Sequence, residues 1–360
     1  MTRKRVVIVD DSMTMRAMIA RALSDDGRFD VVGEAEDPFA ARDIIKQTNP
    51  DVLTLDVEMP RMDGISFLEK IMKLRPMPVV MFSSETHKGS RAAIEALSLG
   101  AIDCVGKPTT ADPAVLSALA DRVFVAAGAS VAGRRPKVAA QSGASFIWNG
   151  KTVLIGASTG GVDALERVLT GMPENGPPVL ITQHMPESFL ASFADRLRPI
   201  IRPRVSLAAP GSPIAQGHVY LAPGGAHHLI LEGRDDRLRC GLATGDKVSG
   251  HRPSVDVLFQ SAVQQASRMV AVLLTGMGRD GAEGMVQLRA GGAHTIAQDA
   301  ATCVVYGMPR VAVELGAVRE SKPIDLIAGA ILAATCRGAG SGARAGMERP
   351  GVGQPSARLG

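Results

Sequence analysis

A serine flanked by glycines follows an apolar run in the middle of the chain. The segment TVLIGASTGG places Ser158 in a G-x-S-x-G pattern between a predicted strand and a predicted helix. That context is typical of a nucleophile elbow, in which small neighbours permit a sharp turn and expose the hydroxyl. The same turn also suits a pyrophosphate bound at a helix N-terminus. Taken alone, the pattern leaves hydrolysis and dinucleotide binding equally open.

The next apolar strand favours hydrolysis. A dinucleotide fold expects an acid about 20 residues beyond the glycines, whereas ITQHM places His184 at that strand end. A serine nucleophile needs such a base. Asp280 in AVLLTGMGRDG follows another apolar strand and is placed to fix the imidazole tautomer. We interpret Ser158, His184 and Asp280 as a catalytic triad, with the Met277 amide as a candidate oxyanion donor. Their chain order differs from that of the α/β-hydrolases.

Acids also end two strands near the N-terminus. Asp10 and Asp11 follow RVVIV, and Asp56 ends DVLTLD. In a parallel sheet these carboxylates converge on one edge, where they suit Mg²⁺. Ser83 and Lys107, at the ends of the fourth and fifth strands, add a hydroxyl and a cation there. A carboxylate nucleophile, a metal and a lysine meet the needs of acyl-phosphate formation, so the pattern predicts phosphorylation of Asp56.

Two series of strands and helices position these residues. Short apolar strands alternate with amphipathic helices from residue 5 to about 125 and again from Lys151 to about Thr335. The pattern predicts an α/β protein: a five-stranded parallel, flavodoxin-like domain, then a doubly wound, mostly parallel catalytic domain with its chemistry at the strand ends. The segments HVYLAP and HHLILE are candidates for an antiparallel hairpin at an edge.

Composition predicts where the domains end. Residues 126–147 lose periodicity and gain Gly, Ala and Ser, which indicates a flexible linker. The Gly, Ala and Arg-rich residues after about Thr335 are expected to be disordered. The predicted division is therefore a first domain over 1–125, a linker over 126–147, a catalytic domain over 148–335 and a tail over 336–360.

Several classes of function are disfavoured by composition. The net charge of +4 arises mostly in the tail, which has no interleaved aromatic residues, so we expect no nucleic-acid binding. The four cysteines form no CxxC pair, which argues against a zinc or dithiol site. His227 and His228 are adjacent on a predicted strand and point to opposite faces, so a joint metal site is not expected. We expect no cofactor for hydrolysis.

Membrane and export signals are not recognised in the sequence. The N-terminal strand is too short for the core of a signal peptide, and no run of about 18 apolar residues occurs. These observations predict a cytoplasmic protein that does not insert into membranes.

The segments VDDS, LDVEMPRMDG and GKP, with Ser83, resemble the two-component receiver family over about residues 4–125. The resemblance implies that Asp56 accepts a phosphoryl group, that Asp10, Asp11, Asp56 and the Glu58 carbonyl serve Mg²⁺, and that Ser83 and Lys107 contact the phosphoryl group. Many receivers have an aromatic residue where this chain has Cys104, so an aromatic rotamer switch is not assumed.

The segments GASTGG, ITQHM, LLTGMGRDG and QDAATCVVYGMP resemble the catalytic domain of the chemotaxis protein-glutamate methylesterase family over about residues 151–335. The resemblance implies hydrolysis of glutamate methyl esters on methyl-accepting chemotaxis receptors and deamidation of certain receptor glutamines. Ser158, His184 and Asp280 fall on the family's triad, Thr159 lies beside the nucleophile, and Met277 falls on the oxyanion position. Phosphorylation by the chemotaxis histidine kinase would relieve inhibition by the receiver.

Three alternatives remain at this point. A response regulator that binds DNA would need a basic recognition helix after the linker, where the sequence instead alternates strands and helices. An NAD-dependent enzyme would bind its cofactor at Gly156–Gly161. A methylesterase that serves another sensory array would share every motif described above.

Overall fold

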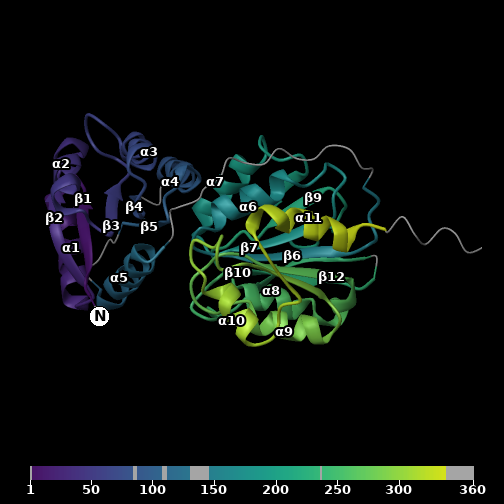
Figure 1. Ribbon diagram of the computed structural model, residues 1–360. Coiled ribbons are helices and arrows are strands. Elements are labelled where there is room, and N and C mark those ends of the chain that lie inside the picture. Colours follow the sequence, from purple (N-terminus) through teal and green to yellow (C-terminus); the bar gives the residue numbers. More distant parts are fainter. Residues whose placement is uncertain (1, 84–86, 108–111, 130–145, 236, 338–360) are drawn as a thin grey trace, which may run out of the picture.

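A computed structural model describes residues 2–83, 87–107, 112–129, 146–235 and 237–337. Two parallel sheets, each covered by helices, lie side by side within this part of the chain (Figure 1). The predicted linker over 126–147 and the predicted tail over 336–360 lie mostly outside the described residues. At the boundary that is described, helix α5 (Pro113–Ala127) continues two residues into the predicted linker.

The N-terminal sheet has the strand order β2-β1-β3-β4-β5, and every pair in it is parallel, which confirms the predicted five-stranded domain. Its strands are β1 (Lys4–Val9), β2 (Phe29–Ala35), β3 (Val52–Asp56), β4 (Val79–Ser83) and β5 (Asp103–Gly106). Besides α5, its helices are α1 (Met13–Asp26), α2 (Pro38–Thr48), α3 (Gly64–Leu74) and α4 (His87–Leu99). Three side chains accept hydrogen bonds from backbone amides at the starts of α1, α2 and α3, as helix N-caps do; they are those of Ser12, Asp37 and Asp63.

The C-terminal sheet has seven parallel strands in the order β14-β13-β12-β6-β7-β9-β8, which confirms the predicted doubly wound fold. The strands are β6 (Thr152–Ala157), β7 (Val179–Gln183), β8 (Arg204–Leu207), β9 (His218–Leu221), β12 (Met269–Leu273), β13 (His294–Gln298) and β14 (Glu320–Lys322). The order reverses at β6, so the strand that carries Ser158 lies at the topological switch point, where such sheets bind ligands.

The predicted pairing of HVYLAP with HHLILE is wrong. β9 pairs in parallel with β7 and β8, whereas β10 (His227–Glu232) pairs antiparallel with β11 (Arg239–Thr244). Gly224 and Gly225, with φ of 78° and 65°, turn the chain out of the sheet between β9 and β10. The segment RCGLAT of β11 escaped recognition because Thr244, its last residue, is its only β-branched or aromatic residue, and such residues indicate a strand.

Helices cover both faces of the C-terminal sheet (Figure 1). One face carries α6 (Gly161–Thr170), α7 (Glu187–Leu197) and α11 (Ile324–Thr335), and the other carries α8 (Val255–Ser261), α9 (Ala282–Ala290) and α10 (Met308–Glu314). The helix predicted over 254–266 is interrupted, because α8 ends at Ser261 and a 3-10 helix, η1 (Val263–Arg268), follows it.

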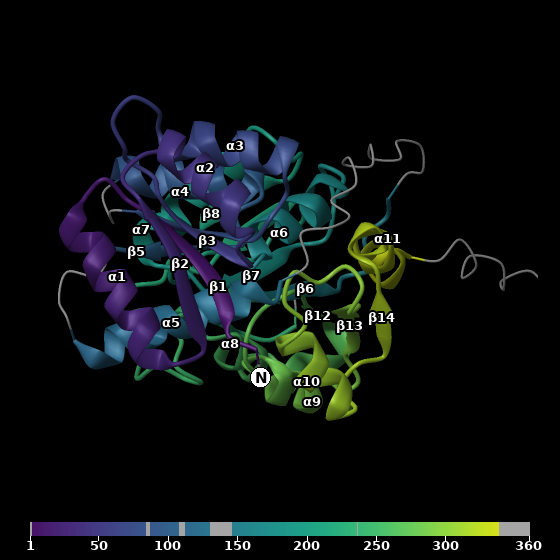
Figure 2. The same cartoon turned by 60° about the vertical axis from the view of Figure 1, so that its left-hand side comes forward.

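The two domains pack directly on each other. Helix α4 of the N-terminal domain contacts α6 and α7, and Figure 2 shows α4 beside α7 from a second direction. Buried residues of α4, including Ile94 and Leu97, belong to the same hydrophobic cluster as Phe189 and Leu190 of α7. Within the described residues, no helix combines the length and apolar character needed to cross a membrane.

Candidate active site

Ser158 lies where β6 ends and the chain turns into α6. Its backbone N–H donates to the Thr275 carbonyl at 3.0 Å, and its own carbonyl accepts from the Gly161 amide at 2.7 Å. Gly160 has a φ of 77°, and a Cβ there would lie 2.6 Å from Val304 Cβ. The turn therefore needs glycine at this position, and it leaves the Ser158 side chain only half-buried.

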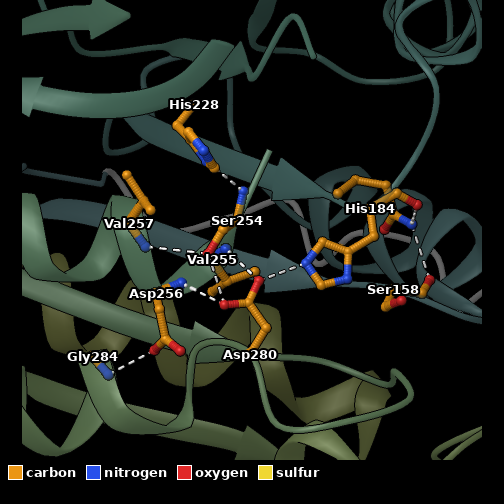
Figure 3. Close-up of polar contacts among 10 residues, drawn as sticks. Ser158, His184, His228, Ser254, Val255, Asp256, Val257, Asp280 and Gly284 are labelled. Carbon is orange, nitrogen blue, oxygen red and sulfur yellow. Dashed lines mark hydrogen bonds and ion pairs between the residues drawn. The ribbon is translucent and has the colours of Figure 1, made fainter. Parts of the chain in front are cut away.

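His184 follows β7 directly, on the strand next to Ser158. Its backbone N–H donates to the Ala157 carbonyl at 3.1 Å, which extends the ladder between β6 and β7. Its Nε2 lies 2.7 Å from Asp280 Oδ2, while its buried Nδ1 has no hydrogen-bond partner among the described residues. Figure 3 shows the imidazole between Asp280 and Ser158. The structure thus brings together the three residues that the sequence predicts as a triad.

Asp280 is held by the first turn of α8. Its carboxylate accepts from Ser254 Oγ at 2.8 Å and from the amides of Val255 and Asp256 at 2.7 Å and 3.0 Å (Figure 3). Burial alone would raise the pKa of Asp280, but the hydrogen bond from His184 and these amides outweigh it and hold the pKa at about 2. Asp280 is therefore ionised at neutral pH, so Nε2 carries the imidazole proton and Nδ1 is the free acceptor.

A second carboxylate, that of Asp256, lies beside Asp280 and has a higher pKa. Asp256 accepts the Gly284 amide at 2.7 Å. Burial, with the neighbouring Asp280 charge, raises the pKa of Asp256 to about 6 despite this hydrogen bond. The environment thus separates the two acids and leaves Asp280 as the permanently charged partner of His184.

The loop after β12 packs on Ser158. A Cβ added to Gly276 would lie 2.7 Å from Ser158 Cβ and 2.4 Å from Met308 Sδ, so only glycine fits between them. Met277 is the next residue in this loop. Met308, which sequence analysis could relate to the site only through a family resemblance, is fully buried beside the same glycine.

Thr275 and Gln183 hold the turn at Ser158 and Thr159 in place, and sequence reasoning gave neither a role. Thr275 Oγ1 donates to the Thr159 carbonyl at 3.0 Å and accepts the Val305 amide at 2.9 Å. Gln183 Nε2 donates to the Ser158 carbonyl at 2.9 Å. Both side chains are buried, so they link the predicted site residues Ser158 and Thr159 to the neighbouring strands.

A further histidine was also missed. The ring of His251 stacks on that of His184, with centroids 3.7 Å apart and planes at 9°. His251 does not end a predicted apolar strand, so the sequence gives no sign that it lies at the site. The position of His251 depends on how the loop after β11 folds onto the end of β7, and no local sequence pattern predicts this.

The acidic edge of the N-terminal domain is assembled as the sequence predicts. Carboxylate oxygens of Asp10, Asp11 and Asp56 lie within 4.8 Å of one another. Lys107 Nζ lies 2.7 Å from Asp56 Oδ2 and 3.2 Å from Asp10 Oδ2. Burial raises the pKa of Asp56 to about 6, and the Asp10 charge adds to it while Lys107 opposes it. Ser83 ends β4, and its carbonyl accepts the Lys107 amide at 2.9 Å.

The N-terminal domain closes the cleft at Ser158. A cavity of about 20 Å³ lies between the domains and is lined by Ser158 and His184. Such a volume holds a water molecule and little more. Its walls from the N-terminal domain are Leu97, Ala101, Ile102, Asp103, Cys104 and Arg122.

Comparison with known proteins identifies both domains. Residues 6–119 match the response regulator receiver domain, and residues 153–331 match the CheB methylesterase domain. A protein-glutamate methylesterase/protein-glutamine glutaminase of Caulobacter vibrioides is 52% identical over 92% of this chain and 98% of its own length. One of Shigella flexneri is 46% identical over 94% of this chain and 99% of its own length.

A solved structure agrees with the C-terminal fold. The crystal structure of the Thermotoga maritima CheB methylesterase catalytic domain is 36% identical, with a TM-score of 0.50, over 51% of this chain and 98% of that one. With a receiver domain in front of a CheB methylesterase domain, and with relatives matched along almost their whole length, the chain belongs to the family of protein-glutamate methylesterase/protein-glutamine glutaminases, which are hydrolases.

Proposed function

We propose that this chain is a phosphorylation-regulated methylesterase that removes methyl groups from glutamate methyl esters of methyl-accepting chemotaxis receptors and deamidates receptor glutamines. The observation that carries the proposal is the contact of His184 with Asp280 beside Ser158, at the ends of adjacent parallel strands. The names of the relatives supply the substrate class. The direct test is release of methanol from receptor membranes that carry tritiated methyl esters, because a different activity would leave the label in place.

In the proposed mechanism, Ser158 Oγ attacks the ester carbonyl while His184 Nδ1 accepts the hydroxyl proton. The ionised Asp280 stabilises the resulting imidazolium through Nε2. The Met277 amide stabilises the oxyanion, and Thr159 supports the turn that presents the serine.

His184 then returns the proton to the leaving methoxide, and methanol departs. Water, deprotonated by His184, attacks the acyl-enzyme, and His184 returns this proton to Ser158 Oγ as the bond to the glutamate carboxylate breaks. For a glutamine, ammonia replaces methanol as the leaving group. These steps use side chains and water, without a cofactor.

The proposal assigns the acidic edge to phosphoryl transfer from the chemotaxis histidine kinase. Three clustered carboxylates with one lysine leave excess negative charge, which fits a hard divalent cation. Asp10, Asp11, Asp56 and the Glu58 carbonyl would hold Mg²⁺, which neutralises charge on the phosphoryl oxygens when bound. Asp56 accepts the phosphoryl group, and Lys107 and Ser83 contact it. We propose the cytoplasm as the place where kinase, receptor and enzyme meet.

Regulation is proposed to act through the closed cleft. The cavity of about 20 Å³ at Ser158 has no room for a receptor side chain, so the domains must separate before the reaction. A polar contact adds to the apolar interface: Ser98 Oγ of α4 donates to the buried Glu166 at 2.7 Å, and Arg196 Nε donates to the same oxygen at 2.7 Å. Phosphorylation of Asp56 biases this interface toward the open form.

Replacing Asp56 with asparagine is expected to remove activation. The amide cannot form an acyl phosphate, so acetyl phosphate should no longer increase methanol release. The assay compares initial rates with and without acetyl phosphate in Mg²⁺. Chelation of Mg²⁺ should have the same effect on the wild type, and Asp30→Asn, an exposed position on β2, is the matched control. Stimulation that persists in Asp56→Asn would contradict the assigned phosphorylation site.

A charge placed in the domain interface is expected to raise basal activity. Leu97 of α4 is 6% exposed and lines the cavity, so Leu97→Glu buries a carboxylate only while the domains are closed. A cost of several kcal/mol for a buried charge exceeds the roughly 1.4 kcal/mol that shifts an equilibrium tenfold. Methanol release without phosphodonor should therefore rise at least about fivefold. Leu74→Glu, at a 79% exposed position of α3, is the control and should have no such effect.

A further inference from the structure

A tight turn places His251 over His184, the proposed catalytic base. The backbones of Val248 and His251 exchange two hydrogen bonds, at 3.0 Å and 2.9 Å. The two residues between them, Ser249 and Gly250, both have positive φ, at 51° and 81°. Positive φ at both central positions is the signature of a type I′ turn, the tight turn that joins antiparallel strands. The conformation of this turn, and with it the place of His251, is therefore closely defined.

The base of this turn is anchored to the hairpin that precedes it. Arg252 Nε donates to the Gly225 carbonyl at 2.8 Å, and its Nη1 donates to the Gly245 carbonyl at 2.6 Å. Three segments that are distant in sequence, the β9–β10 connection, the turn and the end of β7, are thus held together at the active site. This arrangement places the ring of His251 against the ring of His184.

The stacked ring of His251 restrains a tilt of the His184 ring that the contact with Asp280 leaves free. Asp280 holds the imidazole of His184 at one atom, Nε2, and Nδ1 has no partner among the described residues. A single hydrogen bond permits the ring to tilt about that contact. A second ring lying parallel on one face, at 3.7 Å, limits the tilt.

We propose that His251 is a positioning residue for the methylesterase reaction: its ring holds the His184 imidazole in the plane in which Nε2 meets Asp280 and Nδ1 faces Ser158. The inference rests on the proposed function. His251 itself transfers no proton in this proposal; it acts through His184.

The charges around His251 agree with a neutral stacking partner. Burial lowers the pKa of His251 to about 4. The charges of His184, Arg122 and Lys247 act in the same direction, whereas the charge of Asp280 opposes them. His251 is therefore uncharged when His184 becomes an imidazolium, and the pair avoids two adjacent cations.

The test uses the full-length chain activated with acetyl phosphate in Mg²⁺, with release of tritiated methanol from receptor membranes as the assay. His251→Ala removes the stack and should lower kcat by roughly 10- to 100-fold while KM changes little, as expected for a misplaced base. His251→Phe keeps a flat ring without a titratable nitrogen and should restore kcat to within about threefold of the wild type. His218→Ala is the matched control, because His218 also stacks on a ring, that of Tyr220 at 4.3 Å, but at the opposite edge of the sheet.

A spectroscopic readout separates positioning from general stability. The proton that His184 Nε2 shares with Asp280 should give a downfield NMR signal that is sharp in the wild type and in His251→Phe, and broadened in His251→Ala. An unchanged kcat in His251→Ala would overturn the inference, and so would an equal loss in His251→Phe, because the nitrogens would then matter rather than the stack. If the wild type itself releases no methanol, the proposed function fails instead.

Discussion

Ser158→Ala is expected to lower methanol release from methylated receptor membranes by at least about 10³-fold, because loss of a serine nucleophile leaves only the residual effects of binding and oxyanion stabilisation. The serine lies at the end of β6 with its backbone held on both sides, so removal of Oγ should leave the turn intact. The effect should therefore fall on kcat, and circular dichroism should show an unchanged fold.

The matched control for this substitution is Ser267→Ala. Ser267 is exposed in η1, which precedes β12 and so lies at the opposite edge of the sheet from Ser158. Its removal should leave the rate within twofold. Retention of more than a tenth of the wild-type rate in Ser158→Ala would show that another group attacks the ester.

Asp280→Asn is expected to lower kcat by roughly 10³- to 10⁴-fold. The carboxylate accepts from His184 Nε2, Ser254 Oγ and two amides of α8, whereas an asparagine offers one oxygen and an NH₂ group that must face donors. The imidazole would then lose the partner that fixes its tautomer and stabilises its charge. Rates should be measured from pH 6 to 9, and the loss of kcat is expected at every pH in this range.

The pH dependence of stability gives the same substitution a second readout. Because the pKa of Asp280 is lowered to about 2, below its ordinary value of about 3.9, its ionised form stabilises the folded state above about pH 4. That stabilisation is lost as the pH falls toward about 2, and Asp280→Asn should lack this part of the acid dependence. Asp235→Asn, at an exposed position between β10 and β11, is the control. A kcat of Asp280→Asn within tenfold of the wild type would show that the reaction does not need the Asp280 carboxylate.

Residues at strand ends could be predicted from the sequence, because parallel strands bring their carboxyl ends to one edge whatever the details of packing. Asp10 and Asp56 meet Lys107 for this reason, and His184 meets Asp280 for the same reason. All of these residues except Asp280 end or directly follow an apolar run, and Asp280 lies beyond one after a short glycine-containing loop, so periodicity placed them near these edges.

Contacts that depend on loops could not be predicted. His251 reaches His184 only after a turn with two positive φ values and an arginine anchor, and Ser249 gives no sign of a left-handed conformation. The β10–β11 hairpin was missed for a related reason, since its second strand is defined by its partner rather than by its own residues. The residues that form the domain interface were also hidden, because Ile94 and Leu97 have the pattern of ordinary core residues.

Strand β5 reaches both the acidic edge at Asp56 and the cleft at Ser158. Cys104 lines the cavity that contains Ser158, and Lys107, just beyond the end of the strand, contacts Asp56. Three residues of extended chain span only about 10 Å. In the proposed regulation, a phosphoryl group on Asp56 is therefore separated from the wall of the cleft by one short strand.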